Sequence, residues 1–312
     1  MPEITVVIIH YGDYALTSAC LNSVLRSNEA VSIIICDNAS NVADQQLLHD
    51  HANYYFYGTS LTEKPLKGQI IWHRMGFNAG YAAAANAGIR IAKTIYQSYY
   101  ILILNNDCTV HPACIKTLRH TYESLPDCGL LGAKVLFSSA DGLINSVGGS
   151  FNKWTCWQKN IGAREVDAGQ YSGLLKPDYV YGACMFISMK CIDTIGLMDE
   201  RFLLYQEEHD WCIRALGKGY TNYTTCDALV FHQQGASSGK KIKQQQAPDY
   251  ILALQYGNLI RLYLKHFPLL TPVAFIRLFM IVAKRIVHRQ YRHAFLLMKV
   301  IFGYRVHELP AS

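Results

Sequence analysis

Short runs of β-branched residues alternate with helical stretches over the first third of the chain, and this alternation restricts the fold more than any other feature. In chain order, the runs and the helical stretches between them lie at about 4–9, 16–26, 31–36, 69–73, 79–92 and 99–104. Continuous apolar runs are typical of strands buried on both faces of a parallel sheet. The sequence therefore predicts an α/β fold with a mostly parallel central sheet flanked by helices.

Polar residues follow two of these predicted strands at the point where each strand ends. Asp37 and Asn38 come after the second run, and Asn105, Asn106 and Asp107 come after the fourth. In open parallel sheets, ligands bind beyond the carboxyl ends of the strands. These residues could bind a nucleotide or, at Asp107, a hard cation together with substrate phosphates. Taken alone, both clusters are also compatible with simple turns or helix caps.

The segment 74–86 places small residues and amides at the start of a predicted helix. Free peptide N–H groups at such a start can face a phosphate, and Gly76 and Gly80 allow a close approach. The alternative is tight packing of an alanine-rich helix on the sheet. The chain contains neither a G-x-G-x-x-G fingerprint nor a Walker motif.

Three acids, Glu207, Glu208 and Asp210, open a predicted amphipathic helix that also carries Trp211. A carboxylate beside an aromatic ring is a good general base, because apolar surroundings oppose ionisation and raise its pKa. Acids at a helix start can instead act only as partners of the helix dipole. His232 ends a short apolar run, where it could be a ligand or an ordinary surface histidine.

The overall composition, 51% hydrophobic and 17% charged, is that of a globular protein with a sizeable core. The ten cysteines form no C-x-x-C pair, which favours a reducing compartment. The N-terminus resembles no signal peptide, so synthesis in the cytoplasm is expected. Between about 129 and 190, short runs and glycine-rich turns predict added antiparallel strands and an acceptor-side subdomain, and the pattern turns helical from about 249.

The charge of +6 is concentrated at the C-terminal end. Residues 261–312 contain nine Lys or Arg and one acid, a charge of +8, so residues 1–260 carry −2. The apolar stretch 267–283 is interrupted by Pro268, Pro272 and Arg277, which leaves it too short to span a membrane. We expect amphipathic helices on an anionic membrane surface, with a helical cap on the rest of the fold as the alternative.

Taken in order, these motifs resemble the family 2 inverting glycosyltransferases of GT-A fold, especially their bacterial rhamnosyltransferase-like branch. The resemblance covers about 4–240 and rests on the polar strand ends, on Asn78-Ala-Gly80-Tyr, on Tyr181-Gly-Ala-Cys-Met-Phe-Ile, on the acidic helix start and on Val-Phe-His232. It implies a GT-A (Rossmann-like) catalytic domain over 1–240, with a nucleotide-sugar half to about 128 and an acceptor half after it. A basic amphipathic helical region would follow over 241–312.

The resemblance also implies roles for individual residues. The general base maps to Glu208, with Glu207 and Asp210 as neighbours that could replace it. Asp107, at the D-x-D position, and His232 would hold Mg²⁺ or Mn²⁺. The residues implied on the acceptor side are Tyr181, Gly182, Ala183 and Trp211. The residues implied in nucleotide-sugar binding are His10, Tyr11, Asp37, Asn38, Arg74, Asn78, Gly80, Asn105 and Asn106.

By the same resemblance, the chain would move a sugar, with rhamnose favoured, from a dTDP, UDP or GDP donor to a hydroxyl group. The acceptor would be a lipid-linked or polysaccharide glycan of the bacterial cell envelope, reached from the inner face of the cytoplasmic membrane. Nucleic acid is not an expected partner, because residues 1–260 are net acidic and contain no recognised nucleic-acid module. Two alternatives are a catalytically inactive membrane-associated GT-A scaffold and a sugar nucleotidyltransferase.

Overall fold

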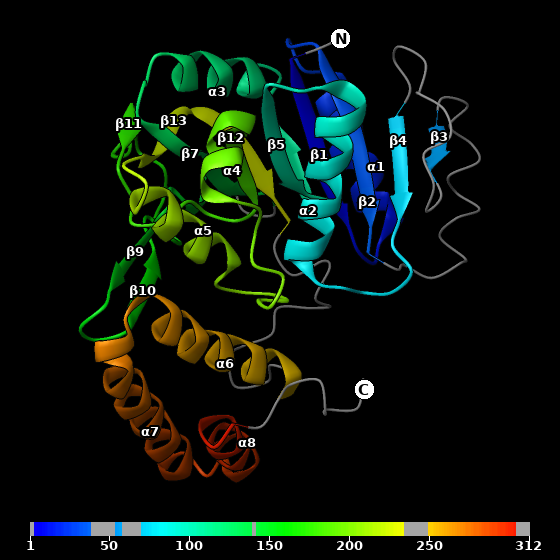
Figure 1. Ribbon diagram of the computed structural model, residues 1–312. Coiled ribbons are helices and arrows are strands. Elements are labelled where there is room, and N and C mark those ends of the chain that lie inside the picture. Colours follow the sequence, from blue (N-terminus) through cyan, green and yellow to red (C-terminus); the bar gives the residue numbers. More distant parts are fainter. Residues whose placement is uncertain (1–2, 39–53, 58–69, 139–141, 234–248, 304–312) are drawn as a thin grey trace.

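The structure of the chain is a computed structural model that describes residues 3–38, 54–57, 70–138, 142–233 and 249–303. The predicted α/β fold is confirmed: a mostly parallel sheet is flanked by helices, and a helical unit follows it (Figure 1). The expected boundary between residues 240 and 241 lies outside the described residues.

The strands are β1 (Ile4–His10), β2 (Val31–Asp37), β3 (Tyr54–Tyr57), β4 (Ile70–Arg74), β5 (Tyr100–Asn105), β6 (Cys108–Val110), β7 (Cys128–Phe137), β8 (Ile144–Ser146), β9 (Gly149–Asn152), β10 (Trp157–Asn160), β11 (Leu174–Leu175), β12 (Cys184–Ser188) and β13 (Thr221–His232). The helices are α1 (Tyr14–Leu25), α2 (Tyr81–Ile91), the π-helix η2 (Ala92–Tyr96), α3 (Cys114–Glu123), α4 (Met189–Ile195), α5 (Glu207–Leu216), α6 (Asp249–His266), the 3-10 helix η3 (Pro268–Leu270), α7 (Thr271–Val287) and α8 (Tyr291–Ile301).

The main sheet has the strand order β11-β13-β7-β12-β5-β1-β2-β4-β3. All neighbours from β5 to β3 are parallel, and β13 is parallel to β7. Strand β12 is antiparallel to both β5 and β7, so it is a reversed strand inside the sheet. Strand β6 pairs with β13, β8 pairs with β7, and β9 and β10 form a separate hairpin.

Strand β1 sends its side chains into two hydrophobic layers. Val6 and Ile8 belong to the layer that α1 and α3 cover, whereas Val7 and Ile9 belong to the layer that α2, α4 and α5 cover. Successive side chains of a strand point to opposite faces. Both faces of β1 are therefore covered by helices, which explains why its sequence is continuously apolar.

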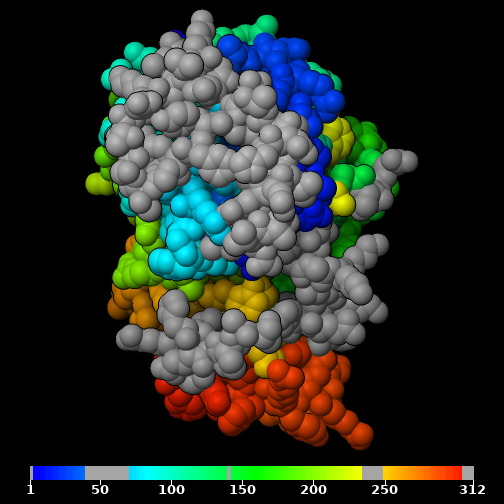
Figure 2. Space-filling view, turned by 90° about the vertical axis from the view of Figure 1, so that its right-hand side faces the viewer, coloured from blue at the N-terminus to red at the C-terminus, as the bar shows by residue number. Residues whose placement is uncertain are grey.

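The helices α6, α7 and α8 pack around a hydrophobic cluster of their own, to which Phe151 and Cys156 of the β9–β10 region also contribute. In Figure 1 this unit lies below the sheet, and Figure 2 shows α6, in gold, between the sheet domain and the orange and red helices. Among the described helices, none combines the length and the apolar character that crossing a membrane requires.

Helix α2 touches β1 most closely at Gly88. A Cβ at this position would overlap Cγ1 of Val7 and would lie 3.1 Å from Sγ of Cys36. The absence of a side chain at Gly88 therefore sets how closely the helix approaches the sheet.

We expect Gly88→Ala to lower the free energy of unfolding by about 1–3 kcal/mol, because an overpacked core must shift. Gly76→Ala is the control, since among the described residues, apart from its two chain neighbours, no atom lies within 4 Å of its added Cβ. Urea unfolding followed by circular dichroism measures both. Equal stability of the two variants would contradict the close packing of α2 on β1.

Candidate active site

The residues expected to bind a nucleotide sugar lie at the carboxyl ends of four adjacent parallel strands. His10 of β1 pairs in register with Asp37 of β2, and Asp37 pairs with Arg74 of β4. On the other side, Ile9 of β1 pairs with Asn105 of β5. The structure thus brings four separate segments of the chain to one edge of the sheet, where ligands bind in open α/β folds.

Two of these side chains hold the turn after β1. His10 is buried, and its Nδ1 lies 2.6 Å from Oγ1 of Thr17. The Nδ2 of Asn106 donates to the same oxygen at 2.9 Å and to the carbonyl of Tyr11 at 3.3 Å. Tyr11 itself is exposed. His10 and Asn106 therefore position the turn, and Tyr11 offers a side chain that a ligand can contact.

Asn38 and Asn78 join the end of β2 to the start of α2. The Nδ2 of Asn38 donates to Oδ1 of Asn78 at 2.8 Å, and its Oδ1 accepts from the peptide N–H of Ala79 at 2.9 Å. Gly80 adopts a φ of 90°, and a Cβ there would overlap the backbone of Leu203. Gly80 is thus the point where the loop before α5 crosses the start of α2.

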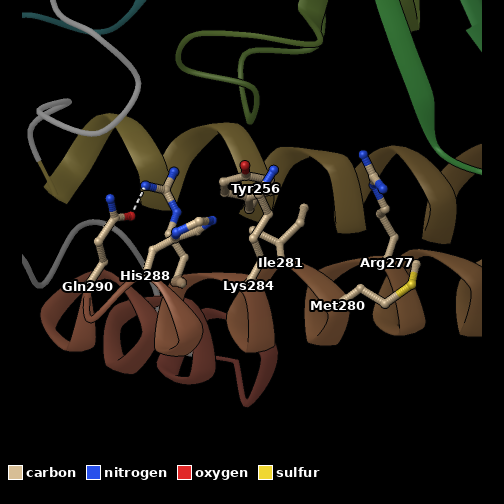
Figure 3. A pocket seen from close by; sticks show the side chains of 8 residues that line it. Tyr256, Arg277, Met280, Ile281, Lys284, His288 and Gln290 are labelled. Atoms are coloured by element: carbon tan, nitrogen blue, oxygen red, sulfur yellow. Dashed lines mark hydrogen bonds between the residues drawn. The ribbon is translucent and has the colours of Figure 1, made fainter.

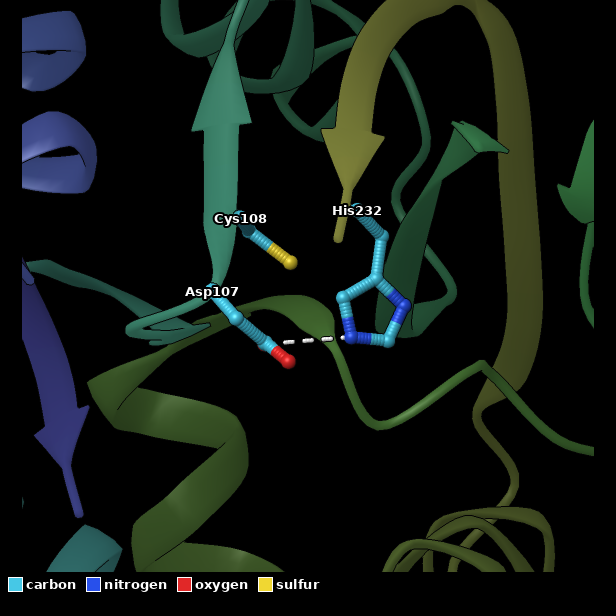
Figure 4. Close-up of side chains that lie close together, drawn as sticks. All are labelled: Asp107, Cys108 and His232. Atoms are coloured by element: carbon cyan, nitrogen blue, oxygen red, sulfur yellow. Dashed lines mark ion pairs between the residues drawn. The ribbon is translucent and has the colours of Figure 1, made fainter. Parts of the chain in front are cut away.

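Asp107 and His232 come together through the pairing of β6 with β13, although they are far apart in the sequence. His232 is in register with Cys108, and its Nε2 lies 3.1 Å from Oδ1 of Asp107 (Figure 4). Both side chains are buried, and the Nδ1 of His232 lies 3.0 Å from Oδ1 of Asn145. If Nδ1 donates to Asn145, the lone pair of Nε2 faces the carboxylate.

This pair has the donor chemistry of a divalent-cation site. Asp107, Cys108 and His232 each offer one ligand atom within 4.8 Å of the others. Two adjacent ligands of an octahedral ion with bonds of about 2.1 Å lie about 3 Å apart, which the carboxylate and imidazole match. Burial raises the pKa of the Cys108 thiol well above its ordinary value, and its Sγ donates to the carbonyl of Ala183. The oxygen and nitrogen donors suit Mg²⁺ or Mn²⁺, which favour such ligands over a thiol.

The segment before β12 connects this pair to the acidic helix. Because β12 is antiparallel to β5, its start lies at the carboxyl end of β5, where the peptide N–H of Asn105 donates to the carbonyl of Ala183 at 3.1 Å. A Cβ on Gly182 would lie 3.7 Å from the carboxyl carbon of Glu208. Gly182 therefore brings the start of α5 against the strand ends.

Tyr181 lies near the Asp107–His232 pair and also near Glu208. Its ring centroid is 6.0 Å from that of His232. Burial raises the pKa of its hydroxyl, and the charges of Asp107 and Glu208 raise it further. Two carboxylates from distant parts of the sequence, Asp107 and Glu208, thus lie near enough to one tyrosine to oppose its ionisation.

Glu207 and Glu208 at the start of α5 have unusual electrostatic surroundings. Burial, followed by the negative charge of Glu208, raises the pKa of Glu207 well above its ordinary value. Burial also raises the pKa of Glu208, although peptide N–H groups at the helix start oppose this shift. Among the described residues, the Oε2 atom of each side chain has no hydrogen-bond partner. A carboxylate with a raised pKa is a stronger proton acceptor than an ordinary glutamate.

Asp210 is turned away from this site and is fully buried among cations. Its Oδ2 accepts from Nε of Arg214 at 2.9 Å, and its Oδ1 lies 2.6 Å from Nζ of Lys265 and 2.7 Å from Nε2 of His266. Burial opposes ionisation, but the hydrogen bonds from His266 and Lys265 hold the pKa of Asp210 below its ordinary value. Asp210 therefore anchors α5 to α6.

Two of the residues implied on the acceptor side are buried. Trp211 is completely buried in the core, where its Nε1 donates to the carbonyl of Gly196 at 2.8 Å. Ala183 is also buried. The structure brings Tyr181 and Gly182 to the site but not the side chain of Trp211.

The loop before α5 is held by α6, which the sequence analysis did not connect with the site. Tyr205 and Gln206 have φ values of 70° and 75°, a conformation that is unfavourable for residues with a Cβ. The buried Asn258 donates from Nδ2 to the carbonyls of Leu204 at 2.9 Å and Tyr205 at 3.0 Å. Arg261 donates to the carbonyl of Arg201 at 2.7 Å. The sequence does not indicate this contact, because α6 contains two amides, Gln255 and Asn258, and nothing in the pattern distinguishes them.

We expect Asp210→Asn to lower the free energy of unfolding by about 1–3 kcal/mol, because the buried carboxylate is the common hydrogen-bond partner of Arg214, Lys265 and His266. Asp193→Asn is the control: Asp193 forms an exposed ion pair with Lys93, and such pairs contribute at most about 1 kcal/mol. Urea titration at neutral pH compares the two. If Asp210→Asn is as stable as the control, the anchoring role of Asp210 is wrong.

Comparisons with known proteins agree with this geometry. The sequence pattern of the family described as Glycosyl transferase family 2 matches residues 5–167, just over half of the chain. A protein of Haloferax volcanii named "Low-salt glycan biosynthesis hexosyltransferase Agl10" is 23% identical over 216 residues, which are 69% of this chain and 62% of that protein. The chain therefore spans less than two thirds of the length of this relative.

Among solved structures, a crystal structure of GalNAc-T7 with UDP, GalNAc and Mn²⁺ is similar to the chain, with a TM-score of 0.62 and 13% sequence identity. The similarity covers 84% of this chain and 48% of GalNAc-T7. At this identity it shows the fold, which is GT-A. Together with the family pattern, these findings establish that the chain belongs to glycosyl transferase family 2.

Proposed function

We propose that this chain is an inverting hexosyltransferase that moves a sugar from a nucleoside-diphosphate donor to an acceptor hydroxyl. The observation that carries the proposal is that Tyr181 lies near the Asp107–His232 pair, while the next residue, Gly182, packs against Glu208. Inverting transfer by one in-line displacement needs a stabiliser for the leaving diphosphate and a base for the acceptor. The two groups of residues can supply these two roles.

Asp107 and His232 would hold the divalent cation, Mg²⁺ or Mn²⁺, with donor phosphates and water completing its coordination. When bound, the cation neutralises negative charge on the departing nucleoside diphosphate. Asn145 positions His232 through its Nδ1, as outer-shell partners of metal ligands do. The strand ends that carry His10, Asp37 and Arg74 would bind the nucleoside part of the donor.

Glu208 would be the general base that takes the proton of the acceptor hydroxyl. Its surroundings raise its pKa, which makes the carboxylate a better proton acceptor near neutral pH. Glu207 is the more deeply buried of the pair, and the charge of Glu208 helps to keep it protonated. We therefore assign Glu207 a structural role and Glu208 the proton transfer.

We further propose rhamnose as the favoured sugar, with dTDP, UDP or GDP as the nucleotide, and a lipid-linked or polysaccharide acceptor of the bacterial cell envelope. The motifs of the strand ends and of the acidic helix support this branch of the family. The basic region 261–312 supports a place on the inner face of the cytoplasmic membrane. The boundary near 240, between catalytic domain and basic helical region, is part of the same proposal.

We predict that Asp107→Ala abolishes the metal-dependent binding of nucleoside diphosphates. A panel of dTDP, UDP and GDP, with and without Mn²⁺, should raise the melting temperature of the unaltered chain only with the preferred nucleotide and metal together. Asp127→Ala is the control, because Asp127 forms hydrogen bonds with Tyr223 away from the strand ends. A full metal-dependent shift in Asp107→Ala would refute the assignment.

We predict that Glu208→Gln retains nucleotide binding but loses turnover by about 10²–10⁴-fold, the usual contribution of a general base. Glu207→Gln is the matched variant on the same helix, and it should keep kcat within about tenfold because glutamine resembles a protonated glutamic acid. Transfer measured with radiolabelled donor sugar distinguishes the two. The opposite ranking would make Glu207 the base.

The pH dependence of kcat should follow the ionisation of Glu208. Because burial raises its pKa above the ordinary value of 4.5, activity should fall with decreasing pH at a point above 4.5. Glu207→Gln should leave this acid limb in place. An acid limb at or below the ordinary glutamate pKa would contradict the assignment of the base.

A further inference from the structure

The C-terminal helical unit contains a surface pocket of about 460 Å³ between α6, α7 and the turn that follows α7. Figure 3 shows its lining, which comes mainly from α7 and points toward α6. The lining residues are Tyr256, Arg277, Met280, Ile281, Lys284, Arg285, His288 and Gln290. This pocket plays no part in the proposed sugar transfer.

The lining carries three permanent positive charges, those of Arg277, Lys284 and Arg285, and no carboxylate. Asp249 is the only acid in the sequence from 249 to 303, and its carboxylate is paired with Arg292 at 2.7 Å. Within the described part of the chain, Arg277 and Lys284 form no ion pair. Within the described residues, the pocket therefore carries an excess of positive charge, to which Arg277 and Lys284 contribute without an ion-pair partner, and it fits an anion.

The cations differ in how firmly they are held. Arg285 is buried, and its Nη1 donates to Oε1 of Gln290 at 2.5 Å, so this guanidinium is oriented by the protein. Arg277 lies over the ring of Trp157, 5.7 Å from its centroid. Two planar guanidinium groups and one ammonium group around a small space are the donors that recognise phosphate oxygens.

An exposed apolar stripe lies beside the pocket, along α7 and the 3-10 helix η3 that precedes it. Leu269, Ile276, Met280 and Val287 are 93%, 59%, 53% and 78% exposed. Ile276, Met280 and Val287 are spaced by 4 and 7 residues, so they share one face of α7, and Leu269 lies in η3 just before this helix. Met280 belongs to both the stripe and the pocket. The exposed Trp157, which Arg277 covers, is a residue type enriched where membranes meet water.

We propose that this pocket binds the phosphate of an anionic phospholipid while the stripe on α7 enters the boundary of the acyl chains. A cationic pocket next to exposed apolar side chains matches a ligand whose charged headgroup adjoins a hydrocarbon tail. The inference deepens the membrane contact included in the proposed function by giving it one defined site. It does not depend on the sugar, the cation or the general base.

The test is sedimentation with vesicles of phosphatidylcholine, alone or mixed with phosphatidylglycerol. The unaltered chain should bind the mixed vesicles and not the neutral ones, and added salt should weaken binding. The variant Arg277→Gln/Lys284→Gln should lower the partition coefficient roughly 30-fold, as expected for two lost contacts of a cation with an anionic surface. Replacing Leu269 and Val287 by serine should also weaken binding.

The matched control is Arg289→Gln/Arg292→Gln, which removes two positive charges from the same helical unit outside the pocket lining. It should change the partition coefficient by only a few-fold. Thermal unfolding of all variants confirms that they are folded. The nucleotide and Mn²⁺ melting shifts of the same variants should be unchanged, so failure of the lipid site and failure of the proposed sugar transfer are separate results.

Three outcomes would overturn the proposal. Equal losses in the two double variants would indicate diffuse surface charge without a specific pocket. Displacement of the chain from mixed vesicles by inorganic phosphate at matched ionic strength would indicate a site for free phosphate. A concentration-dependent dimer that Met280→Glu dissociates, without vesicle binding by the unaltered chain, would assign the stripe to a second copy.

Discussion

Strand β12 runs antiparallel between β5 and β7, and the positions of the chemical groups in the site depend on that reversal. Because β12 is reversed, its first residues meet the last residues of β5, and Tyr181 and Gly182 reach the edge where the parallel strands end. Because β7 and β13 again run parallel to each other, His232 at the end of β13 reaches the same edge. A register error at β12 would separate Asp107 from Glu208.

The part of the site that lies at the ends of the parallel strands could be predicted from local sequence patterns. The apolar runs that end at Asp37 and Asn105 place these residues at the carboxyl edge of any parallel sheet. The fold class and the position of these residues therefore follow from the sequence. The closeness of His232 to Asp107 could not be derived locally, because it depends on the pairing of β13 with β6. It was expected only from the resemblance to a family.

Other features escaped sequence analysis because a residue type does not reveal its partners. Asp210 stands in the same acidic run as Glu208, yet it follows about half a helical turn later and contacts Lys265 and His266. Trp211 was expected near the acceptor, but the amphipathic pattern of α5 turns it into the core. The sequence did not indicate that the side-chain amide of Asn258 holds the loop before α5. Such long-range contacts depend on the folded structure and cannot be derived from local sequence patterns.

Helix α6 contacts two different regions, the loop before α5 and the cationic pocket beside α7. Asn258 on α6 fixes the backbone just ahead of Glu207, while Tyr256, two residues earlier, lines the cationic pocket beside α7. Helix α6 therefore carries the support of the loop before the acidic helix on the same element that lines the cationic pocket. A chain cut before residue 249 would lose both the pocket and the hydrogen bonds that hold the backbone of Leu204 and Tyr205.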